Sequence, residues 1–329
     1  MKAIVLRTYG SPDDLAITEI DKPVPGDDEV LVRVRATSVQ PYDWHHMRGE
    51  PYIARLMPGS LGLRGPKIGI LGADLAGQVE AVGKDVTGFG PGDEVFAQSN
   101  QGGFAEYACV RESDLAPKPG NLSFEQAAAV PMAANTALMG LCDQGRLQAG
   151  QRVLVNGASG GVGTFAVQIA RALGAEVTAV CGARNVDLVK SLGATEVIDY
   201  TTEDFTRNGQ RHDLLLDIAG GHSGSACRRA LTRKGTYVAI GGPPGRWLQP
   251  AGHVFAAVAS SPFVSQRMVM TDVVTCGQKR QNLLTLTRLI EDGEITPIID
   301  RTYPFEEIPA AVRYQEEGHV VGKVVITVR

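Results

Sequence analysis

Residues 153–163, Val-Leu-Val-Asn-Gly-Ala-Ser-Gly-Gly-Val-Gly, place a stretch with very little side-chain volume directly after a short apolar run. From Ala158 to Gly163 the stretch matches the pattern Gly-x-Gly-x-x-Gly, with Ala in the first glycine position. In that pattern Gly160 lets the main chain approach a diphosphate, and Gly163 lets a helix pack closely on the preceding strand. The unpaired N–H groups and the positive dipole at the start of such a helix attract an anion. The residues predicted to bind a dinucleotide cofactor are therefore Ala158, Ser159, Gly160, Gly161, Val162 and Gly163.

A tight turn that binds no ligand is the alternative for the same residues. The glycines stand between an expected strand and an expected helix, and a second strand and helix follow in the same order. This order favours a cofactor site, because a dinucleotide-binding unit requires all of these parts.

The next strand decides which dinucleotide fits. A site for NAD usually has Asp or Glu about 20 residues after the glycines, where it holds the ribose 2′-hydroxyl. Here the expected strand 176–182 ends in Gly182 without an acid, and Arg184 follows closely. Arg184 can donate a charge-assisted hydrogen bond to a 2′-phosphate, and Tyr200, at the end of the next strand, can add a hydroxyl. We predict a preference for NADPH over NADH; the alternative for Arg184 is a solvated residue in the first turn of a helix.

Short strands and amphipathic helices alternate between residues 152 and 242. Strands are expected over 152–157, 176–182, 196–200, 213–220 and 236–242, and helices over 163–174, 186–193 and 225–235. A sixth strand is expected within 267–275. Such alternation requires parallel pairing with right-handed crossovers, so the sequence predicts a doubly wound parallel sheet.

The rest of the chain is typical of a mostly antiparallel β domain. Before residue 120, short β-rich segments are separated by Gly and Pro turn signals. Ser123, with Gln126 three positions later, predicts the capped start of a helix over 123–145. A helix over 282–295 and a strand over 322–329 are expected to return the chain to the first domain. We therefore predict an α/β protein with a β-rich domain at 1–124 and 275–329 and a nucleotide-binding domain at 125–274.

Composition and charge exclude several classes of protein. The 32 basic and 36 acidic residues give a net charge of −4, which leaves no cationic excess for a nucleic-acid partner. Between Lys2 and Arg7 only four apolar residues occur, too few for a signal peptide, and no run of about 18 apolar residues predicts a membrane span. The five cysteines form no Cys-x-x-Cys pair, which is typical of thiols in a reducing compartment. We predict a cytoplasmic protein.

Several stretches in the same order make the whole chain resemble the medium-chain dehydrogenases/reductases, in their zinc-free, quinone oxidoreductase-like branch. Within that branch it is similar to the reticulon-interacting and chloroplast-envelope quinone oxidoreductase homologues. The resemblance implies a GroES-like β-rich catalytic domain beside a Rossmann-type domain. The stretches that carry it include ATSVQPYDWHHMRG, LGADLAGQVEAVG, NGASGGVGTFAVQIARALGAEVTAV and GHVVGKVVITV.

The resemblance also predicts that no metal is bound. Gln40 holds the position of a zinc-ligating Cys in the zinc-dependent relatives, and Ala73 holds that of a His. A zinc site needs about three protein ligands, and two of the expected ones are missing. His45 and His46 cannot replace them from a helix, because adjacent side chains point about 100° apart.

Without a metal to polarise an alcohol or a carbonyl, the favoured acceptor is one that already has an electron-poor carbon. Quinones and α,β-unsaturated carbonyl compounds meet this condition. The predicted activity is therefore NADPH-dependent reduction of a quinone or an enone. Two alternatives remain at this point: an NADP-dependent carbonyl or secondary-alcohol dehydrogenase, and a non-catalytic NADPH-binding sensor.

The loop from residue 40 to residue 52 carries the candidate proton donors and carbonyl anchors. A tyrosine hydroxyl donates a hydrogen bond without a change of charge, so Tyr42 and Tyr52 are the first candidates, with Gln40 and His45 beside them. Water is the alternative proton donor. Asp43 is expected to be a structural cap.

The resemblance further implies residues around the nicotinamide end of the cofactor, and departs from the family at two positions. Gly182 stands where many relatives have Ser, and Val321 where Arg is frequent, so each removes a potential partner of the 2′-phosphate. The resemblance also implies a homodimer that pairs through the edge of the nucleotide-domain sheet, near residues 245–275. The residues that it implies for the cofactor are Thr136, Ala219, Ile240, Gly241 and, as a cation at the cofactor's edge, Lys323. The alternatives are that Thr136 bonds only a carbonyl of its own helix and that Lys323 is an ordinary lysine at a strand end.

Overall fold

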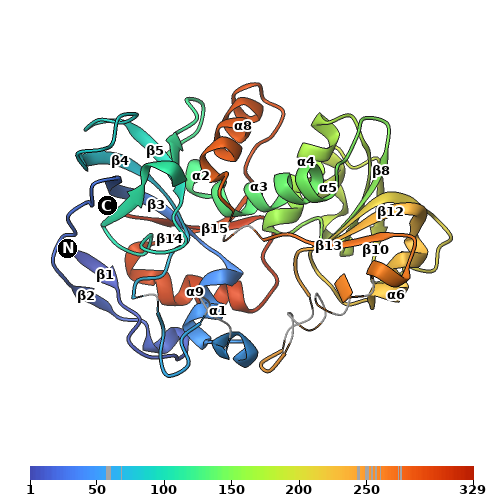
Figure 1. Ribbon diagram of the computed structural model, residues 1–329, viewed down its shortest axis with the longest axis horizontal. Coiled ribbons are helices and arrows are strands. Elements are labelled where there is room, and N and C mark those ends of the chain that lie inside the picture. Colours follow the sequence, from blue (N-terminus) through green and yellow to red (C-terminus); the bar gives the residue numbers. More distant parts are fainter. Residues whose placement is uncertain are drawn as a thin grey trace. The chain divides into compact units, whose positions relative to one another are not determined.

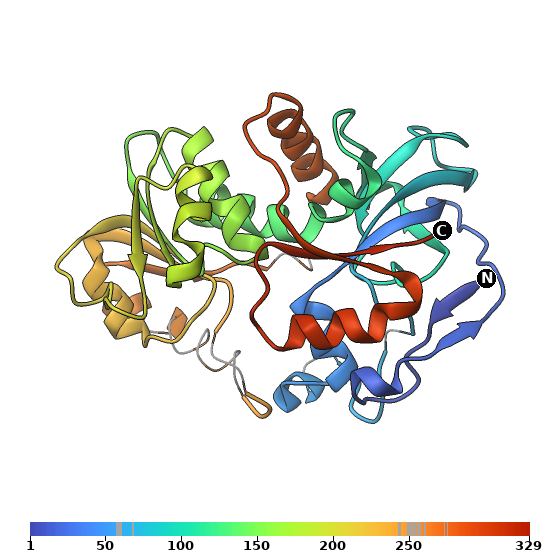
Figure 2. The ribbon, with the colours of Figure 1, turned by 180° about the vertical axis from the view of Figure 1, so that it is seen from behind.

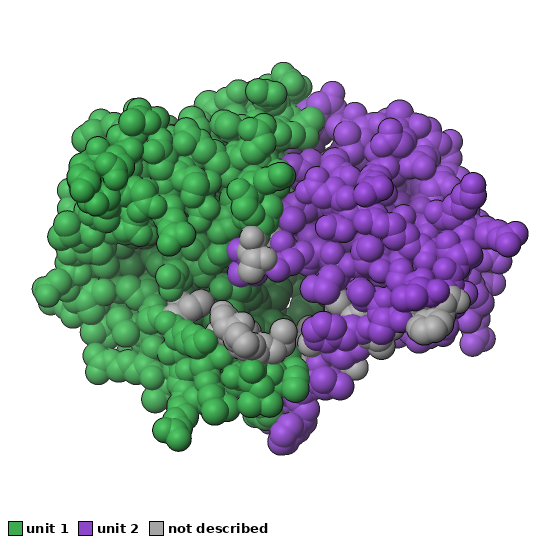
Figure 3. Space-filling model, viewed as in Figure 1, with its two compact units in different colours: residues 1–135, 276–293, 297–329 green, residues 136–275, 294–296 purple. Residues whose placement is uncertain are grey.

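The computed structural model describes residues 1–56, 61–67, 69–242, 245–248, 252, 255, 258–259, 261–272, 274 and 276–329. These residues form two compact units, coloured separately in Figure 3. Unit 1 consists of residues 1–135, 276–293 and 297–329, and unit 2 of residues 136–275 and 294–296.

Unit 2 contains a six-stranded, fully parallel sheet in the order β10-β9-β8-β11-β12-β13. This order, with helices after β8, β9 and β11, confirms the predicted doubly wound sheet of the Rossmann type (Figure 1). Its strands are β8 (Arg152–Asn156), β9 (Glu176–Cys181), β10 (Glu196–Asp199), β11 (His212–Asp217), β12 (Leu231–Ala239) and β13 (Arg267–Met270). Its helices include α4 (Gly161–Ala172), α5 (Val186–Ser191) and α6 (Gly224–Cys227).

The register of this sheet brings the carboxyl ends of the strands together. Asn156 at the end of β8 is paired with Val180 of β9 and with Asp217 at the end of β11, and Asp217 is paired with Ala239 at the end of β12. β8 is central and its residues 153–155 are fully buried, as expected for a parallel strand covered on both faces. The loops that follow β8, β9, β11 and β12 therefore leave the sheet at one edge.

Unit 1 is built on a seven-stranded, mostly antiparallel sheet in the order β14-β15-β3-β4-β5-β7, with β6 also paired to β3. The parallel pair β14 and β15, red in Figure 2, is the exception to the antiparallel pattern. This arrangement confirms the predicted β-rich, GroES-like domain. Its strands are β3 (Glu29–Val39), β4 (Asp74–Val82), β5 (Glu94–Gln98), β6 (Tyr107–Arg111), β7 (Leu115–Pro117), β14 (Ile299–Pro304) and β15 (Lys323–Thr327), and β1 (Lys2–Ile4) pairs separately with β2 (Ile17–Glu19).

The helices of unit 1 pack on this sheet and complete its core. Phe305, Ile308 and Val312, from the α9 region, lie in the same apolar cluster as Val32 of β3 and Ile326 of β15. Burying such side chains stabilises a fold by roughly 1.5–3 kcal/mol each. The helices are α1 (Pro41–Arg48), α2 (Phe124–Ala128), α8 (Lys279–Glu291), α9 (Ile308–Glu316) and the first residues of α3 (Pro131–Leu138).

The helical segment after Ser123 confirms one prediction and corrects another. Ser123 Oγ accepts a hydrogen bond from the Gln126 N–H at 3.2 Å, and Gln126 Oε1 accepts one from the Ser123 N–H at 3.0 Å, so the predicted capping box is present. The single helix expected over 123–145 is wrong. α2 ends at Ala128, α3 starts at Pro131, where the missing N–H suits a first turn, and a π-type helix covers Met139–Gln144.

The expected helix over 225–235 is also wrong in its second half. α6 ends at Cys227, a single 3₁₀ turn follows, and β12 begins already at Leu231. Leu231 is paired with His212 of β11, and its buried side chain joins the core of unit 2, so tertiary pairing decides its conformation. Within 267–275 the sixth strand is confirmed as β13 over Arg267–Met270, while residues 273 and 275 lie outside the described residues.

Candidate functional site

The turn between β8 and α4 has the geometry of an anion-binding site. Gly157 adopts the left-handed conformation at φ +90°, and the main-chain N–H groups of Gly157 and Ala158 both donate to the carbonyl oxygen of Val180, at 3.1 and 3.0 Å. The conformation that requires a glycine is therefore taken one residue before the motif begins. This explains why Ala158 is accepted in the first glycine position.

The other two motif glycines have different surroundings. A Cβ atom on Gly163 would lie 2.1 Å from the carbonyl oxygen of Gly157 and 2.7 Å from main-chain atoms of Ala158, so α4 packs here without room for a side chain. A Cβ on Gly160 would meet nothing closer than Gly157 O at 3.7 Å. Gly160 thus leaves an open approach beside the first N–H groups of α4, as a diphosphate group requires.

A buried carboxylate ties together the strand ends below this turn. Asp217 Oδ1 accepts from Asn156 Nδ2 at 2.7 Å and from the Gly220 N–H at 3.0 Å, and Asp217 Oδ2 accepts from the Tyr237 hydroxyl at 2.7 Å. Asp217 and Tyr237 are completely buried. The sequence reasoning missed this group, although a polar residue at the end of each of two apolar strands was a signal for it.

The residues predicted near the nicotinamide lie on this same edge of the sheet, with one exception. The N–H groups of Ile240 and Gly241 donate to Asp217 O at 2.9 and 3.3 Å, and that of Ala219 donates to Asn156 O at 3.3 Å. Their loops are therefore held by the same strand ends as the glycine turn. Thr136 lies in α3 and is almost fully buried.

The residues predicted to surround the 2′-phosphate follow β9 and β10. Arg184 is exposed in a 3₁₀ turn directly after β9, and a Cβ on Gly182 would lie 3.3 Å from the hydroxyl of the exposed Tyr200. Asn185 Nδ2 donates to Ser159 Oγ at 3.0 Å and so joins this segment to the glycine turn. β9 ends in Cys181 and offers no carboxylate for a ribose hydroxyl. The structure thus brings the three predicted residues and the turn to one edge of unit 2.

A second group of predicted residues lies on α1 in unit 1. Asp43 Oδ2 accepts from the Gln40 N–H at 2.8 Å, so Asp43 caps the helix as expected. Tyr42 lies in the same first turn of the helix, and the centroid of its ring is 4.0 Å from that of the His46 ring. Burial raises the pKa of the Tyr42 hydroxyl, helped by the neighbouring Asp43 charge, so this hydroxyl keeps its proton at neutral pH.

His45 is held in one tautomer. Its Nδ1 lies 3.0 Å from the carbonyl oxygen of Glu50, which only accepts, so Nδ1 carries the proton and Nε2 is a bare acceptor. Its ring stacks on Trp44 at 3.7 Å between centroids. Burial lowers the pKa of His45 to about 4, so the imidazole is neutral at physiological pH. In this state Nε2 accepts a hydrogen bond and has no proton to donate.

Tyr52 lies in a 3₁₀ turn (Tyr52–Leu56) that a cation organises. The guanidinium of Arg55 lies over the Tyr9 ring at 4.2 Å and over the Tyr52 ring at 4.8 Å. The same guanidinium donates to the carbonyl oxygens of Gly49 and Arg48 at 2.7 and 3.1 Å. The orientation of Tyr52 is therefore linked to the end of α1.

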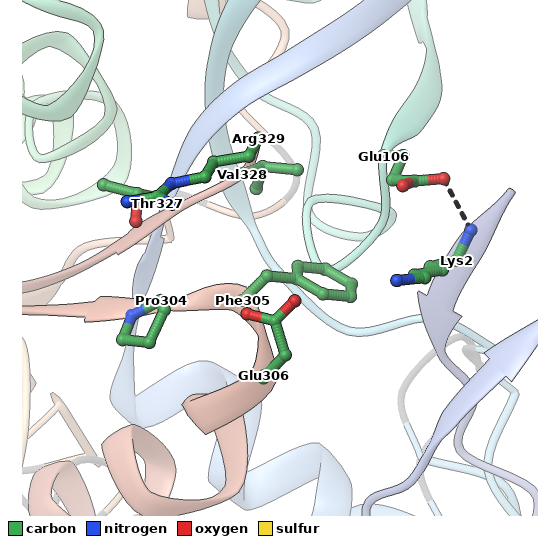
Figure 4. A pocket seen from close by; sticks show the side chains of 8 residues that line it. All are labelled: Lys2, Glu106, Pro304, Phe305, Glu306, Thr327, Val328 and Arg329. Carbon is green, nitrogen blue, oxygen red and sulfur yellow. Dashed lines mark hydrogen bonds between the residues drawn. The ribbon is translucent and has the colours of Figure 1, made fainter.

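The described residues of unit 1 line at least two cavities. One, of about 480 Å³, includes Tyr42 in its wall together with Lys67, Ser99, Asn100 and Gln101, and is large enough for a small organic molecule. The other, of about 300 Å³, contains none of the predicted site residues. Figure 4 shows this second cavity around the Phe305 ring, with a hydrogen bond of 2.7 Å from the Lys2 N–H to Glu106 Oε2 at its rim.

The third predicted feature of unit 1 is Lys323. It lies at the start of β15 and is 2% exposed, where its ammonium interacts electrostatically with Asp74 and Asp43.

Among the residues that the structure describes, no group of three His, Cys, Asp or Glu side chains could hold a metal ion. The absence of zinc nevertheless stays a prediction. None of the described helices has the length and apolar character needed to cross a bilayer.

Two family models match the chain in separate regions. Residues 26–120 match the "Alcohol dehydrogenase GroES-like domain", and residues 192–326 match a model described as "Zinc-binding dehydrogenase". These regions contain most of the sheet of unit 1 and the second half of the sheet of unit 2. Together with the fold and the glycine turn, they define the class as medium-chain dehydrogenases/reductases.

Relatives of known name narrow the assignment. The chain is 32% identical to the chloroplast envelope quinone oxidoreductase homolog of Arabidopsis thaliana, over 99% of this chain and 98% of that protein. It is 34% identical to a mitochondrial NAD(P)H oxidoreductase of Mus musculus, over 100% of this chain and 89% of that protein. The solved structure of the quinone oxidoreductase from Coxiella burnetii superposes with a TM-score of 0.86 at 29% identity, covering 100% of this chain and 99% of that chain.

The chain belongs to the quinone oxidoreductase-like medium-chain dehydrogenases/reductases. It is an NAD(P)H-dependent oxidoreductase that acts on a small molecule.

Proposed function

We propose that this enzyme reduces a quinone or an α,β-unsaturated carbonyl compound with NADPH. The observation that carries the proposal is the bare turn 157–163 before α4, where Gly163 admits no side chain and Gly160 leaves the helix N-terminus open. That arrangement suits a diphosphate, and the named relatives are quinone and NAD(P)H oxidoreductases. Bound NADPH supplies a hydride; the protein must supply position, a dry site and a proton.

The residues of unit 2 would hold the cofactor. The turn 158–163 would bind the diphosphate, and Ala219, Ile240 and Gly241 would lie along the nicotinamide half, joined by Thr136. Gly182, Arg184 and Tyr200 would receive the 2′-phosphate, since no carboxylate ends β9 to repel it. These assignments are proposals for the present chain.

The residues of α1 would serve the acceptor. A carbonyl oxygen that gains negative charge during reduction needs a donor that keeps its proton until that moment. Tyr42 meets this condition, because burial raises its pKa and it lines the 480 Å³ cavity. His45 would accept a hydrogen bond through Nε2. Gln40 would act by holding the start of α1, since its side-chain nitrogen already donates to Ser38 Oγ at 3.1 Å and to Asp74. Tyr52, held by Arg55, is the second candidate for the proton donor.

Steady-state turnover with NADPH and a panel of quinones and enones tests the proposal. The Tyr42→Phe variant should lower kcat by roughly 10-fold or more, because positioned acid catalysis contributes at least that much. The Tyr52→Phe variant is the matched comparison, since it removes the same atom from the neighbouring candidate. Unchanged turnover in both variants would show that water delivers the proton. No turnover of any acceptor by the wild-type enzyme would contradict the proposed function itself.

The cofactor preference has its own test in Arg184→Ala. Loss of a charged hydrogen bond to the 2′-phosphate should lower kcat/KM for NADPH roughly 10- to 150-fold and leave kcat/KM for NADH nearly unchanged. The ratio of the two kcat/KM values, measured at one acceptor concentration, is the readout. An equal loss with both cofactors would remove Arg184 from the specificity site.

Dimerisation and cellular location stay predictions. β13 is at the edge of the six-stranded sheet, and an uncovered edge is suited to pairing with a second copy. The expected seam at 245–275 falls in part outside the described residues. A cytoplasmic location is likewise only predicted, since the named relatives include chloroplast and mitochondrial proteins.

A further inference from the structure

Three ionisable side chains are enclosed together in unit 1. Asp43 of α1 and Asp74 of β4 are completely buried, and Lys323 of β15 is 2% exposed. β3 is paired with β4 on one side and with β15 on the other, and this pairing brings the distant residues together. Charges enclosed in this way cost several kcal/mol each unless they are compensated.

The two carboxylates hold the start of α1 through hydrogen bonds. Asp43 accepts from the N–H groups of Gln40 and Gly72, at 2.8 and 3.0 Å. Asp74 accepts from the side-chain amide of Gln40, from Ser38 Oγ at 3.1 Å and from the Met132 N–H at 2.9 Å. Gln40 is therefore held by its main chain through Asp43 and by its side chain through Asp74.

Every one of these contacts requires an acceptor, so both carboxyl groups must lack their protons to serve all of them. Burial opposes this. It raises the pKa of Asp43 to about 7 and that of Asp74 to about 6, and it lowers the pKa of Lys323 to about 8. The Lys323 charge acts in the opposite sense on both acids, lowering their pKa values, and for Asp74 it is the largest effect that opposes burial. The ammonium therefore stabilises the carboxylate form that binds Gln40.

We propose that Lys323 is a positioning residue for the acceptor site, acting as an internal cation that keeps Asp74 ionised. Through Asp74 it fixes Gln40 and the first turn of α1, which carries Tyr42. This role rests on the proposed function for Tyr42. It differs from a direct contact of Lys323 with the cofactor, because Lys323 acts here through Asp74 and need not contact NADPH.

Measuring kcat and NADPH binding separately in Lys323 variants distinguishes positioning through Asp74 from a direct contact with the cofactor. Lys323→Met leaves two buried carboxyls without a cation, so kcat with para-benzoquinone should fall at least 10-fold, while the Kd for NADPH, from fluorescence titration, should change less than threefold. Adding Asp74→Asn removes one negative charge and keeps an acceptor oxygen for Met132. The double variant should recover folding stability, but its kcat should stay at least 10-fold below wild type, because an asparagine amide has one acceptor oxygen and cannot accept from both Met132 and Gln40 as the Asp74 carboxylate does. Lys323→Arg, which keeps the charge, should retain more activity than Lys323→Met.

Thermal melting provides a readout that does not depend on turnover. Lys323→Met should melt at a lower temperature than wild type, and the double variant should melt above Lys323→Met even if the single variant is too unstable to assay. The inference is wrong if the double variant melts no higher than Lys323→Met, or if it regains kcat to within about threefold of wild type, which would show that the Asp74 carboxylate is not needed. It is also wrong if both variants lose NADPH affinity 10-fold or more, which would assign Lys323 to the cofactor. If wild type has no quinone or enone turnover while melting follows the expected order, the proposed function fails and the charge pairing stands.

Discussion

Replacing Gly163 by alanine is expected to destabilise unit 2 and to abolish measurable NADPH binding. The added Cβ would lie 2.1 Å from the carbonyl oxygen of Gly157, which is main chain and cannot rotate away. α4 must therefore move from the turn, and overpacking of this kind costs about 1–3 kcal/mol or more of folding free energy. Because the first N–H groups of α4 move with the helix, NADPH affinity should fall by roughly 100-fold or more.

Gly160→Ala is the matched control for this prediction. It also adds one methyl group to the same turn, but the nearest atom would be 3.7 Å away, and the backbone at φ −80° suits alanine. The melting temperature should therefore stay close to that of wild type, while the methyl group still obstructs the approach of the diphosphate and weakens binding. Calorimetric titration with NADPH and thermal melting distinguish the two variants. Normal NADPH affinity in Gly160→Ala would mean that the diphosphate lies elsewhere.

Removing the Asp217 carboxylate is the second substitution with a large expected effect. Asp217→Ala removes the buried acceptor that the Tyr237 hydroxyl, the Asn156 amide and the Gly220 N–H share. An unsatisfied buried donor costs about 1–3 kcal/mol, so the free energy of unfolding should fall by about 3 kcal/mol or more. NADPH affinity should also fall, because Asn156 leads directly into the glycine turn.

Tyr237→Phe provides the graded comparison, since it removes a single donor from the same carboxylate and keeps the ring in the core. Denaturant unfolding of both variants should give a clearly smaller loss for Tyr237→Phe. Equal losses in the two variants would show that the hydrogen bond from Tyr237 to Asp217 accounts for the whole effect, and that the contacts of Asn156 and Gly220 with this carboxylate contribute nothing.

The features that could be predicted from sequence are those determined by neighbouring residues. Gly160 and Gly163 could be predicted to form a turn because the space that a missing side chain leaves is used by residues close in sequence. Ser123 and Gln126 could be predicted to start a helix because they bond each other three positions apart. Leu231 could not be placed, because its pairing with His212 outweighs the local helix pattern.

The candidate site was predicted unevenly for the same physical reason. Tyr42 and His45 lie on one helix, so their proximity is visible in the sequence. The group formed by Asp43, Asp74 and Lys323 was not, because only the pairing of β3 with β4 and β15 brings these residues together. The sequence shows that Asp74 begins an apolar strand. It does not show that Lys323, about 250 residues later, compensates the charge of Asp74.

The position of β15 in the sheet of unit 1 also sets an order of assembly on the ribosome. β15 contributes residues 323–327 and pairs with β3, whereas unit 2 is encoded almost entirely between residues 136 and 275. Unit 2 therefore emerges almost complete while the second half of β3, residues 36–39, still lacks its partner β15. Until β15 is synthesised, the nascent β3 edge needs protection from unwanted strand pairing, and the nucleotide-binding unit is free to fold first.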